Sequence, residues 1–383
     1  MAVHFSVEEL AARRRAACDA MAARDLDGLL LFKQESMYYL TGYDTFGFCF
    51  FQCLYLGADG RVALLTRAPD LRQAQQTSII EDIRIWIDGA GRNPAEDLRA
   101  LLEEIGLRGR RLGVELDTYG LTAASWRGVE AALAGFATLE DASDLVNALR
   151  LVKSEAELDC VRLAAALADD ALEEAIRLTG PGAYEGDILA AMQGAVFRGG
   201  GDYPGNEFII GSGTGALLCR YFTGRRHLEA EDQLTLEHAG AYRRYHCALM
   251  RTLLVGTAHP EHVAMHGACR EALDACVEAV RPGRPMGEVY AAHARTLDRA
   301  GYREHRMNAC GYSLGATFTP TWMDRFMFYE DNPLEMQPGM VFFLHMILMN
   351  SDSGRAMTLG QTVIVTDTGH EPLTRLPLDL VVK

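Results

Sequence analysis

The first 150 residues alternate short apolar runs with stretches of helical spacing. Residues 97–106 have helical spacing and end at Gly106, a common helix stop. Near the start, Ser6 and Glu9 form a capping-box pattern ahead of a segment rich in Ala and Arg. Together with the predicted strands, this indicates one small α/β domain over residues 1–150. The apolar runs that predict these strands are 28–32, 53–57, 62–66 and 112–117.

The pattern changes near residue 150, where the spacing predicts a long amphipathic helix over 149–178 with Ser154 as its N-cap. Beyond it the strand patterns come in pairs, and the helical stretches 261–281 and 286–301 lie between them. Paired strands with segregated helices favour an α+β domain, which we place at 151–383. The predicted strands of this domain are 208–213, 233–240, 248–256, 340–349 and 362–369.

Composition narrows the class of protein. Hydrophobic residues make up 49% of the chain, yet no apolar run approaches the roughly 18 residues that a membrane span needs. The net charge of −15 argues against nucleic acid and anionic membranes as partners. The N-terminus has no signal-peptide pattern, and the nine cysteines include no C-x-x-C pair, which indicates reduced thiols. We therefore expect a cytoplasmic location.

One predicted strand pair carries more ionisable chemistry than a packed hairpin requires. The segment 236–252 reads LEHAGAYRRYHCALMRT. Strand alternation puts Leu234 and Leu236 on one face and Thr235 and Glu237 on the other, which predicts that Glu237 lies on the polar face of the strand. The GSGTGA loop at 211–216 is not followed by helical spacing, so we expect no dinucleotide site there.

The motifs of the second half, taken in order, resemble the creatinase/prolidase (aminopeptidase P) family. The resemblance covers nearly the whole chain. It implies the pita-bread fold, in which a C-terminal domain with a curved antiparallel sheet and helices follows a smaller α/β domain. The motifs that carry it are SEAELDCVRLAAAL, GSGTGALLCRY, LEHAGAYRRYHCALMRTLLVG, GYSLG, QPGMVFF and TVIVTDTGHEPLT.

The departures from this family concern its metal site. The metallopeptidases of the family hold two metal ions with two Asp, one His and two Glu. No ligand keeps its identity here, and Ala and Gly have no side chain that could coordinate a metal. We therefore expect no metal and no other cofactor. The residues at the five positions are Glu237, Ala248, Tyr312, His345 and, at or next to the last position, Gly360.

The chain is most similar to the branch of the family that works without metal. Ectoine hydrolases resemble it in the Glu at 237, in the segment 239–252 and in GYSLGATFTPTW at 311–322. The resemblance implies a metal-independent hydrolase that cleaves a C–N bond in a small cyclic amidine or amide bearing a carboxylate. The alternatives are a creatinase-like amidinohydrolase, an Xaa-Pro peptidase, a dimethylsulfoniopropionate lyase, and a non-catalytic binding protein.

The resemblance also implies roles for individual residues. Glu237 is expected to attack the substrate carbon or to activate water, within a wall formed by Phe342, Phe343 and Met346 or their neighbours. Either His246 or His345 is expected to move protons to the leaving nitrogen, and Tyr312 to donate a hydrogen bond to the tetrahedral centre. We expect these four residues, Glu237, His246, His345 and Tyr312, to be catalytic.

Substrate binding is assigned to a second set of residues. Arg220 is expected to grip the substrate carboxylate, because a guanidinium binds a carboxylate through two hydrogen bonds. Tyr221, Trp322 and Arg325 are expected to line the same pocket. The resemblance further implies a homodimer, in which the loop with Asp44 and Phe46 reaches the partner subunit's site.

Overall fold

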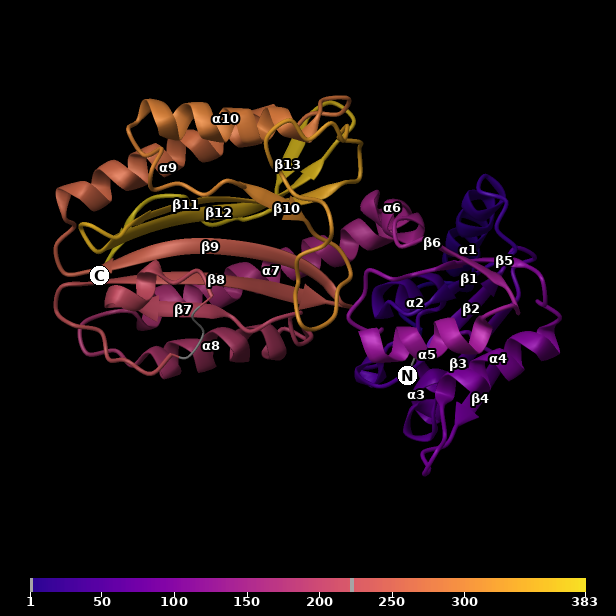
Figure 1. Cartoon of the computed structure of the whole chain (residues 1–383). Helices are drawn as coiled ribbons and strands as arrows, with labels where there is room; N and C mark the ends of the chain where they lie inside the picture. Colours follow the sequence, from indigo (N-terminus) through magenta and orange to yellow (C-terminus); the bar gives the residue numbers. More distant parts are fainter. Residues whose placement is uncertain (1–2, 221–223) are drawn as a thin grey trace. The chain divides into compact units, whose positions relative to one another are not determined.

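The computed structural model describes residues 3–220 and 224–383, which form two compact units, Met1–Arg150 and Leu151–Lys383 (Figure 1). The N-terminal unit contains a six-stranded mixed sheet in the order β4-β3-β2-β1-β5-β6. Its strands are β1 (Gly28–Leu31), β2 (Cys53–Gly57), β3 (Val62–Arg67), β4 (Asp82–Trp86), β5 (Arg111–Val114) and β6 (Thr138–Asp141). Its helices are α1 (Val7–Ala22), α2 (Gln34–Thr41), α3 (Leu71–Thr77), α4 (Pro94–Ile105), α5 (Ala123–Leu133) and α6 (Leu145–Leu151).

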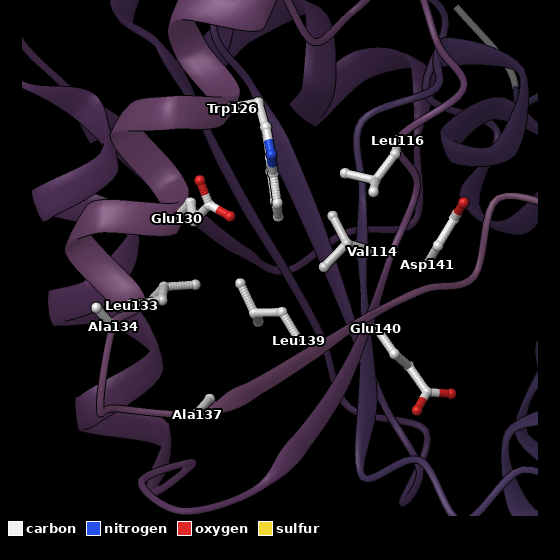
Figure 2. A pocket seen from close by; sticks show the side chains of 10 residues that line it. All are labelled: Val114, Leu116, Trp126, Glu130, Leu133, Ala134, Ala137, Leu139, Glu140 and Asp141. Atoms are coloured by element: carbon white, nitrogen blue, oxygen red, sulfur yellow. The ribbon is translucent and has the colours of Figure 1, made fainter.

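A cavity of about 280 Å³ lies in this unit, lined by residues of α5, β5 and β6. Figure 2 shows the side chains of Trp126, Leu133 and Leu139 around the same space, with the Glu130 carboxylate beside them. The Glu140 carboxylate accepts a hydrogen bond from Arg111 Nη2 at 2.7 Å. Apart from Glu130, Glu140 and Asp141, the residues that line this cavity are apolar.

The C-terminal unit is built on an eight-stranded sheet in which the strands follow the order β10-β11-β12-β9-β8-β7, with β13 beside β12 and β14 beside β9. All of its strand pairs are antiparallel except β14–β9. Its long strands are β8 (Asp232–Tyr242), β9 (Tyr245–Val255), β11 (Val341–Asn350) and β12 (Arg355–Val365). The short strands are β7 (Ile209–Ser212), β10 (Gly311–Ser313), β13 (His370–Pro372) and β14 (Val381–Val382).

The unit has four long helices, α7 (Glu155–Leu178), α8 (Glu185–Arg198), α9 (Pro260–Ala279) and α10 (Met286–Arg299). In Figure 1, α9 and α10 lie beside β11 and β12, and α7 and α8 lie beside β8 and β7. Leu249 packs in a cluster with residues of α7, and Leu359 packs in the large core cluster with α9 and α10. Leu359 pairs with Arg251, two residues from Leu249, so both leucines lie on the same side of the sheet. The unit is therefore α+β. Its helices pack against one face of the sheet, and the other face carries the candidate active site.

The structure adds detail that the sequence pattern did not predict. The helix expected over 149–178 is two helices, because α6 ends at Leu151 and α7 begins at Glu155. Ser154 starts α7 with a reciprocal capping box to Glu157, which satisfies backbone N–H groups at the new helix start. Helix α8 and strand β10 were not predicted, and β12 begins at Arg355, earlier than the apolar run suggested. Among the described residues, no helix is both long and apolar enough to cross a membrane.

Candidate active site

A row of paired residues crosses the open face of the C-terminal sheet. Glu237 lies between Ile209 on β7 and Met250 on β9. Met250 pairs with Gly360 on β12, and Gly360 pairs with His345 on β11. Because directly paired residues point to the same side of a sheet, Glu237 and His345 project into the same space.

This space is a cavity of about 210 Å³. Of the residues predicted for the site, Glu237, Tyr312, His345, Arg220 and Trp322 all line it. No sequence pattern pointed to the remaining lining residues. Ile209 lies on β7 and Ile347 on β11, and the others lie in loops. The remaining residues are the polar Asn206 and Cys219 and the apolar Ile209, Met307, Ala309, Met323, Met327 and Ile347.

Glu237 is a buried carboxyl group in this cavity, with 9% of its surface exposed. Its Oε1 accepts a hydrogen bond from the Tyr312 hydroxyl at 3.1 Å. Burial raises the pKa of Glu237 to about 7, because it outweighs the opposing effects of the Tyr312 hydrogen bond and the Arg220 charge. A carboxyl with this pKa can both take up and release a proton near neutral pH.

Tyr312 and His345, whose rings line the same cavity as Glu237, behave as neutral groups. Burial raises the pKa of Tyr312 well above its usual value, so the phenol keeps its proton. Burial lowers the pKa of His345 to about 4, so its imidazole is neutral at pH 7. The Tyr312 and His345 rings lie with their centroids 5.8 Å apart, and His345 Nδ1 has no hydrogen-bond partner among the described residues. His345 thus stands in the cavity wall as a neutral imidazole with one unused, buried ring nitrogen.

His246, which is predicted to be catalytic, is not among the residues that line the cavity. It lies four positions along β9 from Met250 and pairs with Ala241. Its Nε2 accepts a hydrogen bond from Gly205 N at 2.8 Å, and its Nδ1 lies 3.1 Å from Thr317 Oγ1. Burial lowers the pKa of His246 to about 4. The ring thus joins two chain segments, and both of its nitrogens are occupied.

Three of the residues expected around the pocket, Arg325, Phe342 and Met346, are not among those that line the cavity. Arg325 is exposed and does not line the cavity, although Met323 and Met327 on either side of it do. Phe342 and Met346 pack in the helix-covered core, because they alternate with His345 along β11 and so face the other side of the sheet. A prediction that groups neighbours on a strand into one wall ignores this alternation.

Three predicted residues remain untested by the cavity. Tyr221 lies outside the described residues. Asp44 and Phe46 belong to the N-terminal unit, where the Phe46 side chain is 76% exposed. The expectation that their loop reaches the site of a partner subunit stays a prediction.

The five positions that correspond to metal ligands do not fit a pair of metal ions. Glu237, Tyr312 and His345 offer one carboxylate, one phenol and one imidazole, whereas a hard divalent pair needs several carboxylate oxygens. A Cβ at Gly360 would meet the Phe343 ring at 2.8 Å, so an aromatic ring fills the space next to that position. Within residues 3–220 and 224–383, no group of three or more His, Cys, Asp or Glu is placed to hold a metal ion.

Family models match both parts of the chain. The model described as "Metallopeptidase family M24" matches residues 159–367, and "Creatinase/Prolidase N-terminal domain" matches residues 13–152. An uncharacterized hydrolase/peptidase of Sinorhizobium fredii is 30% identical over 100% of this chain and 99% of its own length. The ectoine hydrolase of Halomonas elongata is 26% identical over 99% of this chain and 98% of its own.

Solved structures share the same architecture. The crystal structure of dipeptidase PepE from Mycobacterium ulcerans superposes with a TM-score of 0.85 at 25% sequence identity. The match covers 99% of each chain, so both units have counterparts in that enzyme.

Proposed function

The chain belongs to metallopeptidase family M24, as a hydrolase with a creatinase/prolidase N-terminal domain and the pita-bread fold. From this premise we propose that it cleaves a C–N bond in a small cyclic amidine or amide that bears a carboxylate, without a metal ion. The observation that carries the proposal is Glu237, a buried carboxyl with a raised pKa in a small cavity beside Tyr312 and Arg220.

The cavity supports a small substrate with one negative charge. Its volume of about 210 Å³ lies below the roughly 300–1,000 Å³ of pockets that hold drug-sized ligands. Arg220 is its one cationic side chain among the described lining residues. Because a guanidinium binds a carboxylate through two hydrogen bonds, Arg220 favours a carboxylate as the anchoring group of the ligand.

In the proposed reaction, water adds across the C–N bond. Glu237 either attacks the amidine or amide carbon, forming an acyl imidate or a mixed anhydride that water then hydrolyses, or removes a proton from water that attacks the same carbon. As the C–N bond breaks, the neutral His345 imidazole gives a proton to the leaving nitrogen and takes one from the water consumed in the reaction, so the ring ends neutral. Tyr312 donates a hydrogen bond from its hydroxyl to the negative charge that forms on the tetrahedral centre near Glu237. Arg220 holds the carboxylate throughout.

Similarity to Xaa-Pro dipeptidases favours one second candidate, cleavage of an Xaa-Pro dipeptide. The donor set argues against it, because peptide hydrolysis in the metallopeptidases of the family depends on metal-bound oxygen ligands that Ala248 and Gly360 do not provide. The two candidates separate in one assay. Small cyclic amidines, amides and guanidines and a set of Xaa-Pro dipeptides are incubated with enzyme, with and without added Mn²⁺, and products are followed by mass.

Two variants test the proposed roles once a substrate is found. Glu237→Gln preserves side-chain volume and removes the charge, so kcat should fall by several orders of magnitude, as for loss of a nucleophile or base. Arg220→Ala should mainly raise KM. Met327→Leu, a volume-conserving change in the same wall, is the matched control and should change kcat little. The proposal fails if Glu237→Gln keeps more than about a tenth of wild-type turnover, which is roughly 1.4 kcal/mol of barrier.

A further inference from the structure

We infer that Trp322 is a positioning residue that orients the Tyr312 hydroxyl toward Glu237. The inference rests on the proposed function for its effect on turnover. The hydrogen-bond chain itself is a property of the free protein and can be measured without a substrate.

The direction of the chain follows from the chemistry of its members. Trp322 Nε1 lies 2.8 Å from the Tyr312 hydroxyl oxygen, and that oxygen lies 3.1 Å from Glu237 Oε1. An indole N–H can only donate, so the Tyr312 oxygen accepts from Trp322. The hydroxyl then has its own proton to place, and the Glu237 carboxylate is the acceptor in reach. Without Trp322, the same hydroxyl oxygen would be free to accept a hydrogen bond from a protonated Glu237 carboxyl.

Trp322 is held in place by contacts that do not involve the substrate. Its side chain is 1% exposed, and its backbone N–H donates to Asn206 Oδ1 at 3.0 Å. A Cβ at Gly205 would lie 2.7 Å from Trp322 N, so the segments around Gly205 and Trp322 approach each other closely. His246 links the same two segments through Gly205 N and Thr317 Oγ1. These contacts therefore fix the position from which the indole N–H donates to the Tyr312 hydroxyl.

A directed hydroxyl favours the charged form of Glu237. The other titratable or charged groups that face this carboxyl in the cavity are Arg220 and Cys219 from the segment before Tyr221 and His345 from β11. Of these, only Arg220 carries a positive charge at neutral pH, since burial raises the pKa of Cys219 and lowers that of His345. The Tyr312 hydrogen bond is thus one of two interactions that oppose the effect of burial, and Trp322 keeps it directed at the carboxylate.

Nuclear magnetic resonance of protein labelled with ¹⁵N-tryptophan tests the hydrogen bond. The chain has three tryptophans, Trp86, Trp126 and Trp322, so the spectrum contains three indole signals. Replacing each in turn with Phe assigns the signals, and if Trp322→Phe does not fold, the other two variants assign the third by elimination. In Tyr312→Phe, exchange of the Trp322 indole proton should become at least about tenfold faster, as expected on loss of a buried hydrogen bond.

Trp86 is the internal control, because its Nε1 donates to Phe51 O at 2.8 Å in the other unit. Its signal should not respond to Tyr312→Phe. If the Trp322 signal also keeps its position and exchange rate in Tyr312→Phe, the hydrogen bond is absent and the inference is overturned.

A double-mutant cycle then tests the role of Trp322 in turnover. Trp322→Phe should lower kcat about tenfold when Tyr312 is present, and less than about twofold in the Tyr312→Phe background. A tryptophan that acted by touching the substrate would cause the same loss in both backgrounds, which would overturn the positioning role. If no substrate of the proposed class is turned over, the proposed function fails, while the indole measurement still decides the hydrogen bond.

Discussion

At the scale of single residues, the site depends on one carboxyl group. Glu237 takes the place of the first metal-binding Asp of the family, and no other carboxylate among the described residues lines its cavity. With Ala248 and Gly360 contributing no charge, burial of Glu237 is opposed by Arg220 and by the Tyr312 hydrogen bond. The raised pKa follows from this imbalance, and it has a measurable effect on folding stability.

Stability should fall as pH rises through the titration of Glu237. The pKa of this group is about 7 in the folded protein against an ordinary value of 4.5, so the folded state binds more protons between these values. Its contribution is present below pH 4.5 and is lost as pH rises to about 7. Glu237→Gln cannot lose a proton, so its free energy of unfolding relative to wild type should rise with pH, by up to about 3 kcal/mol at pH 8.

The measurement is urea denaturation of both proteins at pH 5.5 and pH 8. Glu261→Gln is a control, because hydrogen bonds from Ser353 and Asn350 lower the pKa of Glu261. Its titration lies below pH 5.5, so its difference from wild type should be nearly the same at both pH values. A Glu237→Gln difference that does not change with pH would show that the carboxyl titrates normally.

At the scale of elements, the candidate site lies where β9 and β12 join the two halves of the sheet, a boundary that we call the seam. The register between β9 and β12 contains two Cα pairs, Leu359 with Arg251 and Gly360 with Met250. Side chains bridge the strands on either side of these pairs. Thr252 Oγ1 accepts from Thr358 N at 2.8 Å, and Thr362 Oγ1 accepts from Ala248 N at 3.0 Å. Two threonines thus replace ladder hydrogen bonds where the sheet opens.

Thr252→Val should destabilise the C-terminal unit by about 1–3 kcal/mol, because it leaves the buried Thr358 N–H without its acceptor. Thr235→Val is the matched control. The Thr235 hydroxyl contacts only another hydroxyl, that of Thr252 at 3.4 Å, among its described hydrogen bonds, so its loss should cost less than about 1 kcal/mol. Chemical denaturation of both variants gives the comparison. Equal losses would mean that the seam does not depend on Thr252.

At the scale of the whole molecule, the chain keeps the architecture of its family and departs from it in the site. Both family models match and the PepE structure aligns over 99% of the chain, so the fold does not depend on the metal-ligand identities. The pita-bread sheet is held by strand pairing and by the helices packed on its other face. A change of chemistry on the open face therefore leaves these contacts in place.

We expect metal content to distinguish this chain from the metallopeptidases of the family. Purified protein should contain no stoichiometric Mn, Co, Fe or Zn, and a chelator should leave activity unchanged, because three mismatched donors do not form a dinuclear site. Elemental analysis and assays before and after chelation provide the test. Two equivalents of tightly bound metal, or activity that needs added metal, would contradict the prediction.

Assembly is the second property of the whole molecule, and we expect a homodimer with an isologous interface. The stretch 41–51 reads TGYDTFGFCFF, and Phe46 and Phe50 are 76% and 48% exposed in their unit. Sedimentation at micromolar concentration should give about twice the 42.1 kDa of the chain. Phe46→Glu should weaken the dimer, whereas Tyr119→Glu, a change of another exposed aromatic in the same unit, should not. A wild-type monomer at this concentration would refute the prediction.

Local pattern in the sequence was enough to place most strands and the α+β class, because alternation and helical spacing depend on neighbouring residues. It also identified Glu237, Tyr312 and His345, since each departs from a family position that can be read along the chain. Which of these side chains share a cavity is decided by the register between strands far apart in sequence. The row from Glu237 to His345 requires three strand pairings.

Only the tertiary structure placed His246 outside the cavity wall and showed that Trp322 donates a hydrogen bond to Tyr312. His246 has the residue type and the strand of a catalytic group, but its nitrogens meet Gly205 and Thr317, which lie 41 and 71 residues away. The Trp322–Tyr312–Glu237 chain likewise joins a loop to two strands. Hydrogen bonds of this kind depend on where loops pack, and no periodicity in the sequence records that packing.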